Sequence, residues 1–301
     1  MNFKMQSFET YQNLSVMQFS VFEFNKFDFI SGVKAVDNNY LKMNEVDISG
    51  NVNEIYISND SKFYILLTDG DILKGAKQNR VFNTSVFLEP YLKYKIPVSC
   101  VESGRWSFDS PKFTKSDYSA PVSMRKRKSE AVFRNLEKCQ KYQADQSDVW
   151  NCVSYLSKRN VVNSETSDLD DVFEARRIDF RDFINSFSPL KNANGLAIFS
   201  GEKLLNIEVF GRTGVYADYF PQILKSVSVE RFDIDDKSLK IPEDYAEMTV
   251  QRLLYQIGEM EHQIYPGAAA GVEKRFKNPK VSGFELNYNN YLIHLSLFYL
   301  N

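Results

Sequence analysis

The first third of the chain alternates short apolar runs with polar turns, a pattern typical of β-structure. Residues 53–59 (NEIYISN) alternate cleanly, and residues 63–67 (FYILL) form a continuous apolar run of the kind that is covered on both faces. The pair Asp69–Gly70 then indicates a tight turn. Residues 81–88 (VFNTSVFL) and 96–102 (IPVSCVE) predict further strands, so we expect roughly the first 110 residues to be mostly β.

Helical periodicity replaces this alternation in the middle of the chain. Residues 125–142 carry apolar side chains near helical spacing, and residues 147–159 and 167–187 predict two more helices. Ser147 and Asp148 are candidate caps of the second helix, and acidic residues open the third, where the helix dipole favours them. The polar segment between these two helices predicts an exposed loop.

The last third of the chain mixes both patterns. Residues 195–211 predict a hairpin turned at Gly201–Glu202, and residues 284–300 predict another turned at Asn289–Asn290. Between them, two segments have helical spacing.

These two segments are residues 214–227, where Pro221 would kink or restart a helix, and residues 243–263, the longest helical pattern. Strands come first, helices follow, and a mixed segment closes the chain. This order favours an α+β fold with mixed or antiparallel strands over a wound parallel sheet. Because no long flexible linker divides the sequence, we expect one composite domain over residues 1–301.

Composition limits the class of protein. The 37 basic and 39 acidic residues are balanced, which argues against a nucleic-acid partner, because binding to a polyanion requires a basic excess. No apolar run reaches the roughly 20 residues of a membrane-spanning helix, so we expect no membrane partner. Three cysteines without CxxC spacing suit a reducing compartment, and no secretory signal is visible at the N-terminus. We therefore expect a cytoplasmic protein.

The chain has only two histidines, His262 and His294, which excludes a histidine-rich metal site. Any Ser–His–Asp arrangement would have to use one of them. Because His294 lies in the apolar segment YLIHLSLFYL, we expect it to be a half-buried strand residue rather than a catalytic one.

Residues 75–80 (GAKQNR) concentrate hydrogen-bonding side chains between two predicted strands. Lys77 and Arg80 are cationic donors that suit phosphate. Gln78 and Asn79 can each donate and accept, as ribose hydroxyls or a base edge would require. The segment is not a Walker loop, because it lacks the GxxxxGK[ST] pattern.

If the strand continued to Leu88, Asn79, Asn83 and Ser85 would share one unusually polar side. The alternative interpretation is a solvated strand edge.

Residues 100–106 (CVESGRW) form a second candidate. Glu102 ends an otherwise apolar stripe, where a carboxylate tends to lie at the core margin. Arg105 could pair with it, and Trp106 could stack on a flat ligand. The alternative is a structural Glu–Arg pair beside a core tryptophan.

Three further features are less specific. Gln146 and Trp150 are four residues apart and would share a helical face, with core packing of Trp150 as the ordinary explanation. Arg125 in MRKRKSE could bind phosphate, although a solvated helix start is the favoured interpretation. Glu208 and Arg275 are single charges within strand-like patterns.

Taken together, the segments DGDILKGAKQNRVFNTSVFL, IPVSCVESGRW, ADQSDVW and GLAIFSGEKLLNIEVFG resemble one bacterial family. It is the ADP-ribosylglycohydrolase- and rhodanese-phosphatase-superfamily-associated protein domain. The resemblance covers about residues 40–300 and is strongest from 66 to 106. It implies a role near NAD or ADP-ribose metabolism, acting on a derivative that carries phosphate.

We therefore expect the protein to bind an ADP-ribose- or nucleotide-like small molecule with phosphate, and hydrolytic processing is a further hypothesis. Glu102 would be the general base or the ribose anchor. The expected ligand-binding residues are Lys77, Gln78, Asn79, Arg80, Asn83, Arg105, Trp106 and Gln146. The sequence contains no obvious metal ligands, although a divalent cation would suit phosphate chemistry, and it leaves the oligomeric state open. The alternatives are a non-catalytic sensor or scaffold of an ADP-ribose pathway, and a buried polar network that fixes strand register.

Overall fold

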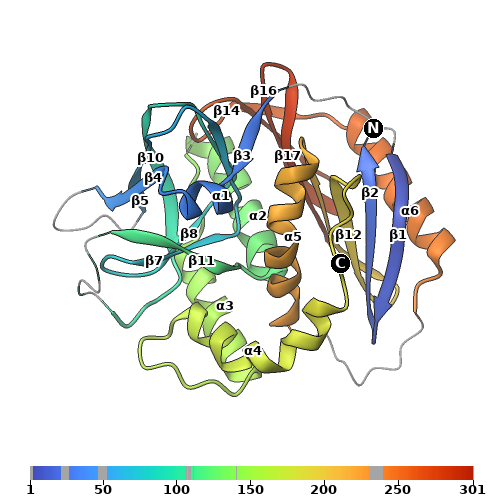
Figure 1. Ribbon diagram of the computed structural model, residues 1–301, viewed down its shortest axis with the longest axis horizontal. Coiled ribbons are helices and arrows are strands. Elements are labelled where there is room, and N and C mark those ends of the chain that lie inside the picture. Colours follow the sequence, from blue (N-terminus) through green and yellow to red (C-terminus); the bar gives the residue numbers. More distant parts are fainter. Residues whose placement is uncertain are drawn as a thin grey trace.

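The computed structural model describes residues 3–21, 27–46, 53–105, 107, 110, 112–139, 141–230 and 240–300. Two β regions lie side by side, with helices between and around them (Figure 1). The α+β fold class that the sequence predicts is confirmed. No helix within these ranges could cross a membrane.

One β region is an eight-stranded antiparallel sheet that combines both ends of the chain (Figure 1). Its order is β1-β2-β12-β13-β17-β16-β15-β14. The strands are β1 (Phe3–Tyr11), β2 (Leu14–Val21), β12 (Gly195–Ser200), β13 (Lys203–Phe210), β14 (Gln263–Pro266), β15 (Val272–Lys277), β16 (Val281–Tyr288) and β17 (Tyr291–Tyr299). The N-terminal hairpin therefore pairs with a strand from the last third of the chain, through contacts such as Phe19 opposite Gly195.

The other β region contains a six-stranded and a three-stranded sheet. The first has the order β11-β7-β8-β10-β5-β4 and the second the order β3-β6-β9. The six strands are β4 (Leu41–Glu45), β5 (Glu54–Asn59), β7 (Asp71–Gly75), β8 (Arg80–Phe82), β10 (Lys93–Cys100) and β11 (Phe113–Ser119). The three are β3 (Phe29–Ser31), β6 (Tyr64–Leu67) and β9 (Val86–Leu88).

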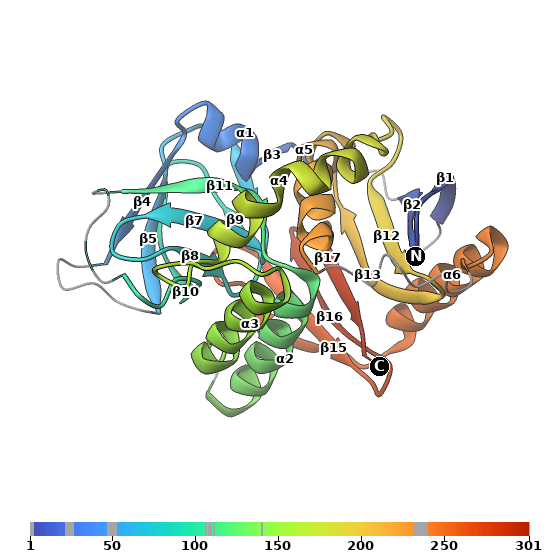
Figure 2. The ribbon, with the colours of Figure 1, turned by 90° about the horizontal axis from the view of Figure 1, so that it is seen from below.

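The helices occupy three positions. They are α1 (Gly32–Asp37), α2 (Val122–Cys139), α3 (Gln146–Arg159), α4 (Leu169–Asn185), α5 (Thr213–Ser228) and α6 (Glu243–Glu259). Helix α5 lies between the two β regions, whereas α6 packs on the outer face of the eight-stranded sheet (Figure 1). Helices α2, α3 and α4 lie together on one side of the molecule (Figure 2). Both β regions share a core with α5, but a single domain over the whole chain stays a prediction.

Several local predictions are confirmed. Strands β12 and β13 form the expected hairpin, as do β16 and β17. Asn289 and Asn290 have φ of 50° and 66°, the left-handed values that a two-residue hairpin turn requires. Helix α5 continues through Pro221 as one element, without a restart.

The single strand expected over residues 81–88 is wrong. The chain forms β8 and β9 there, and they belong to different sheets. Thr84 and Ser85 make the turn between them, because their hydroxyls reach buried partners on the eight-stranded sheet: Thr84 Oγ1 donates to Glu273 Oε2 (2.5 Å). A continuous polar side from residue 79 to 85 therefore does not exist.

Two smaller expectations at α3 also differ. The cap is Asp145, whose carboxylate accepts from the backbone N–H groups of Ser147 and Asp148. Trp150 is 39% exposed rather than packed in the core, because its side of α3 faces solvent.

An aromatic cluster consolidates the junction of the two β regions. Phe87 lies at its centre and stacks on Tyr64 at 5.7 Å, while Phe29 and Tyr288 lie edge-on or tilted against it at 5.4 and 5.3 Å. Phe87 is fully buried, so its ring contributes both apolar burial and aromatic geometry.

We predict that Phe87→Ala lowers the free energy of unfolding by about 3–5 kcal/mol, because a large cavity would remain at the junction. Urea denaturation measures this change. Ile178→Ala on α4 is the control: its side chain is 74% exposed, and we expect a change below about 0.5 kcal/mol. A loss in Phe87→Ala as small as that of the control would contradict the prediction.

Candidate functional site

The segment GAKQNR forms a tight turn between β7 and β8. Gly75 has φ of +107°, and a Cβ there would lie 2.6 Å from the Lys112 carbonyl oxygen, so the turn requires glycine. Asn79 Oδ1 accepts from the Gly75 N–H (2.9 Å) and closes the turn. The backbone of Asn79 also accepts from the Val101 N–H, which brings this turn to the end of β10.

The two predicted segments meet at Glu102. Its Oε2 accepts from the Asn79 N–H (3.0 Å). Arg105 forms a two-point pair with the same carboxylate, with Nε to Oε1 at 2.8 Å and Nη2 to Oε2 at 2.7 Å. Arg105 Nη1 also donates to the Ala76 carbonyl (2.7 Å), which binds the loop after β10 to the turn.

Asp168 joins this cluster, although the sequence pattern indicates only an acidic helix start at this position. Asn79 Nδ2 donates to Asp168 Oδ2 (2.8 Å), while Asp168 Oδ1 caps α4 by accepting from the Asp170 N–H (3.2 Å). Asp168 and Glu102 also form an isolated β-bridge. Asn79 therefore binds both Glu102 and Asp168, which are here called the carboxylate pair.

The two members of the carboxylate pair differ in acidity. Burial, together with the negative charges of Glu102 and Asp170, raises the pKa of Asp168 to about 7. Burial also acts to raise the pKa of Glu102, but hydrogen bonds from Arg105, Asn79 and Thr166 outweigh it, so this pKa is lowered. Near neutral pH, Asp168 therefore exchanges between its protonated and ionised forms, whereas Glu102 stays ionised.

Two cationic side chains, Arg105 and Lys74, lie next to the carboxylate pair. Lys77 and Arg105 are half-buried. Lys74 binds Asp170 at 2.6 Å, and this contact raises the pKa of Lys74 against the opposing effect of burial. Cationic side chains of this kind suit an anionic ligand.

Arg80 lies deeper than the sequence suggested. Its side chain is 0% exposed and contacts Gln78 Oε1 (3.2 Å), Glu45 Oε1 (3.4 Å) and the sulfur of Cys100. Burial raises the pKa of Cys100 to about 11, so this sulfur is a thiol at neutral pH. Ligand binding by Arg80 and Gln78 stays a prediction, since both side chains are already paired within the protein.

Asn83 and Gln146 also support the backbone. The Gln146 carboxamide accepts from the Cys100 N–H and donates to its carbonyl, both at 2.8 Å, which imitates a strand pair. Asn83 accepts from Ser99 Oγ (2.8 Å) and donates to the Tyr142 carbonyl (3.0 Å). Their binding of a ligand stays a prediction, and Trp106 lies outside the described residues.

A second polar group, here called the buried network, lies between the two β regions. Arg125 Nη2 pairs with Asp69 Oδ1 (2.6 Å) and with Glu208 Oε1 (2.7 Å). His294 Nε2 lies 2.9 Å from Glu208 Oε2, and His294 Nδ1 lies 2.8 Å from Ser85 Oγ. This Ser–His–Glu order resembles a hydrolase triad, but each of the three is at most 1% exposed. A substrate cannot reach it in this conformation.

The buried network corrects two expectations. His294 is fully buried rather than half-buried, because both faces of β17 are covered. Arg125 and Lys128 do not lie on a solvated helix start: α2 begins between the β regions, and both side chains are buried. Lys128 donates to the carbonyls of Asp69 and Phe82, and burial lowers its pKa to about 7.

The noted single charges of β13 and β15 both have buried partners. Glu208 belongs to the network, and Arg275 pairs with Glu273 at 2.5 Å.

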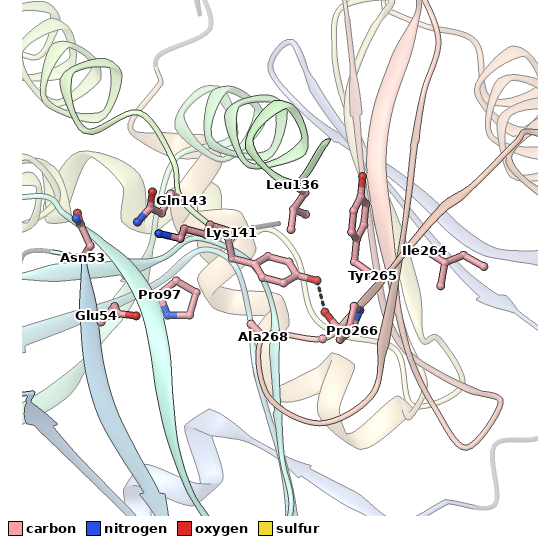
Figure 3. Close-up of a pocket in the computed structure, with 12 residues that line it drawn as sticks. Asn53, Glu54, Pro97, Leu136, Lys141, Gln143, Ile264, Tyr265, Pro266 and Ala268 are labelled. Atoms are coloured by element: carbon pink, nitrogen blue, oxygen red, sulfur yellow. Dashed lines mark hydrogen bonds between the residues drawn. The ribbon is translucent and has the colours of Figure 1, made fainter. Parts of the chain in front are cut away.

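A cavity of about 660 Å³ opens near the end of α2 (Figure 3). It is here called the tyrosine cavity, and its lining residues are Asn53, Glu54, Pro97, Leu136, Lys141, Tyr142, Gln143, Ile264, Tyr265, Pro266, Gly267 and Ala268. Both β regions contribute to it. Within the described part of the chain, no group of three His, Cys, Asp or Glu side chains is arranged to hold a metal ion.

We predict that Arg125→Met lowers the free energy of unfolding by about 3–5 kcal/mol, because Asp69 and Glu208 would remain buried without a compensating charge. Thermal and urea unfolding measure the loss. Arg127→Met is the matched control, since Arg127 is exposed in the same basic run. Equal losses in the two variants would show that the buried network does not join the β regions.

The same variant has a predicted pH dependence. In the wild type, burial acts to raise the pKa of Asp69, but Arg125 outweighs it and the pKa is lowered. This pairing therefore stabilises the fold fully above the ordinary pKa of an aspartate, and the stabilisation is lost only as the pH falls below that value, through the lowered pKa of Asp69. In Arg125→Met, falling pH would instead protonate the unpaired carboxylates. The difference in stability between the two proteins should therefore narrow from pH 7 to pH 4, and a constant difference would contradict the assignment.

Comparison with known families identifies the chain. Searches of curated proteins and of solved structures find no match. A family model matches residues 2–298, which extends the expected range of about 40–300 to almost the whole chain. The protein belongs to the family of the ARG and Rhodanese-Phosphatase-superfamily-associated Protein domain, ARPP-1.

Proposed function

We propose that this protein binds an ADP-ribose-like ligand that carries phosphate, and hydrolyses a bond at the anomeric carbon of its ribose. The family is associated with ADP-ribose-linked proteins, which supports the ligand class. The observation that carries the proposal is the carboxylate pair, in which Asn79 holds an ionised Glu102 beside an Asp168 whose pKa is raised to about 7. Two carboxyl groups with separated acidities can serve as acid and base in glycosidic hydrolysis.

In the proposed reaction, water adds to the anomeric carbon and the bond to the leaving group breaks. Glu102 accepts a proton from the attacking water. Asp168 donates its proton to the leaving group, so that charge is balanced on both sides of the carbon. Arg105, which pairs with Glu102, and Lys74, which pairs with Asp170, would bind the phosphate together with Lys77 of the same turn.

Glu102→Gln should reduce turnover by about 10²–10⁴-fold, because the amide cannot accept a proton. The assay follows ADP-ribose released from NAD and from ADP-ribose 1″-phosphate, with and without Mg²⁺. ADP-ribose itself is the third compound; it has no leaving group at the anomeric carbon and should not turn over. Glu165→Gln, at an exposed carboxylate in the loop before α4, is the matched control and should retain full activity. Wild-type turnover in a folded Glu102→Gln variant would overturn the assignment.

The rate should depend on pH through Asp168. A group that donates a proton is active below its pKa, so the rate should fall about tenfold per pH unit above about 7. In Asp168→Asn this decrease should disappear, and a low rate independent of pH should remain. If the decrease near pH 7 persists in Asp168→Asn, another group donates the proton.

A non-catalytic role is the second candidate function. Glu102 is only 3% exposed, and both of its oxygens accept hydrogen bonds within the protein, from Arg105 and Asn79. Such contacts also occur in purely structural hydrogen-bond networks. Calorimetric binding of ADP-ribose without turnover would favour a sensor. If Asn79→Ala lowers the melting temperature and none of the three compounds raises that of the wild type, a purely structural cluster is favoured.

A further inference from the structure

The tyrosine cavity has separate aromatic and polar ends (Figure 3). Tyr265, Ile264, Leu136 and Pro266 lie towards one end, and Asn53, Glu54, Lys141 and Gln143 lie towards the opposite end. Its volume of about 660 Å³ is within the range of roughly 300–1,000 Å³ that is usual for small-molecule sites. A ligand that fits this cavity would itself have a flat apolar part and a polar part.

The aromatic end is held rigidly. The Tyr142 hydroxyl donates to the Pro266 carbonyl (2.7 Å), and the Tyr142 carbonyl accepts from Asn83 Nδ2 (3.0 Å). The buried guanidinium of Arg275 lies 5.9 Å from the centre of the Tyr142 ring. Tyr265 lines the same cavity from β14. Because little side-chain freedom would be lost on binding, these two rings suit a planar ligand ring.

The polar end offers hydrogen bonds and charge. Asn53 and Gln143 carry carboxamides, which can donate and accept at the edge of a base or at a hydroxyl. Glu54, which pairs with Lys95 at 2.5 Å, provides a carboxylate of the kind that binds ribose hydroxyls. Lys141 is an exposed point charge that suits a phosphate.

We infer that the tyrosine cavity is a binding site for a purine nucleoside 5′-phosphate. The purine lies between Tyr142 and Tyr265, the ribose faces Glu54, and the phosphate binds Lys141. This site shares no lining residue with the carboxylate pair, so the inference does not rest on the proposed hydrolytic function.

An extended peptide fits this place less well, although β14 is the edge strand of its sheet. The Tyr142 hydroxyl already occupies the Pro266 carbonyl, and Gln263 Nε2 donates to Glu137 on α2 (2.9 Å). The first contact occupies a backbone acceptor that a peptide strand would have to pair with, and the second joins this strand to α2. A small ring-bearing molecule needs no such pairing.

Calorimetry with AMP, adenosine and inorganic phosphate as separate probes tests the inference. Saturable binding of AMP is expected, with weaker binding of adenosine. Tyr265→Ala should weaken the affinity for AMP at least tenfold, because an aromatic ring that stacks on the purine is lost. Lys141→Glu should weaken the binding of AMP but leave the binding of adenosine unchanged. Lys141 is exposed, so this substitution should leave the fold intact. Tyr155→Ala and Lys158→Glu, exposed residues of α3 outside the cavity, are the matched controls and should bind AMP normally.

Three results would overturn the inference. AMP binding that is absent, or that is unchanged in both Tyr265→Ala and Lys141→Glu, would exclude the site. Phosphate that binds as tightly as AMP, with no binding of adenosine, would show a simple anion site. AMP binding that is lost in Glu102→Gln but intact in Tyr265→Ala would place the nucleotide at the carboxylate pair instead. That last result would leave the proposed hydrolytic function standing.

Discussion

The arrangement of the two β regions depends on one buried guanidinium. Arg125 leaves the start of α2 and lies between Asp69, from the turn before β7, and Glu208 on the eight-stranded sheet. Two carboxylates buried on facing surfaces would repel each other and lose hydration, so the regions can close only around a compensating cation. Hydrogen bonds then fix how the two β regions align. Ser85, the residue before β9, contacts His294 on β17, and His294 contacts Glu208. The apolar cores provide the driving force for burial, while this ion group determines how the surfaces meet.

The carboxylate pair and the tyrosine cavity adjoin different positions along β10 and its continuation. The strand ends at Cys100, and the chain beyond it carries Glu102 towards α4. Pro97, near the middle of the strand, lines the tyrosine cavity. Between these two positions in the sequence, Gln146 at the start of α3 binds the backbone of Cys100. One rigid strand therefore positions two chemically different places.

Local features were predictable because their causes are local. Asparagine readily adopts the left-handed backbone values that a two-residue hairpin turn requires. The Asn289–Asn290 pair was therefore enough to recognise that hairpin from a short segment. Residues 81–88 have strand-forming side chains throughout, but the partners of Thr84 and Ser85 lie about 200 residues away and break the strand in two. Charge patterns alone likewise suggested that Arg125 is solvated, since nothing nearby in sequence reveals its partners. Asp168 was missed for the same reason: its role arises from Asn79, on a distant turn.

The pairing of β2 with β12 constrains the order of folding. Gln18 hydrogen-bonds to a carbonyl 170 positions later in the chain, and the strand opposite it is synthesised later still. During translation, the N-terminal hairpin therefore exposes an apolar face and an unpaired edge until most of the polypeptide has left the ribosome. Sheets closed by such distant contacts form slowly, because a long loop must be ordered first. A nascent chain with this topology therefore keeps an unpaired strand edge for longer than one whose strands pair with their neighbours in sequence.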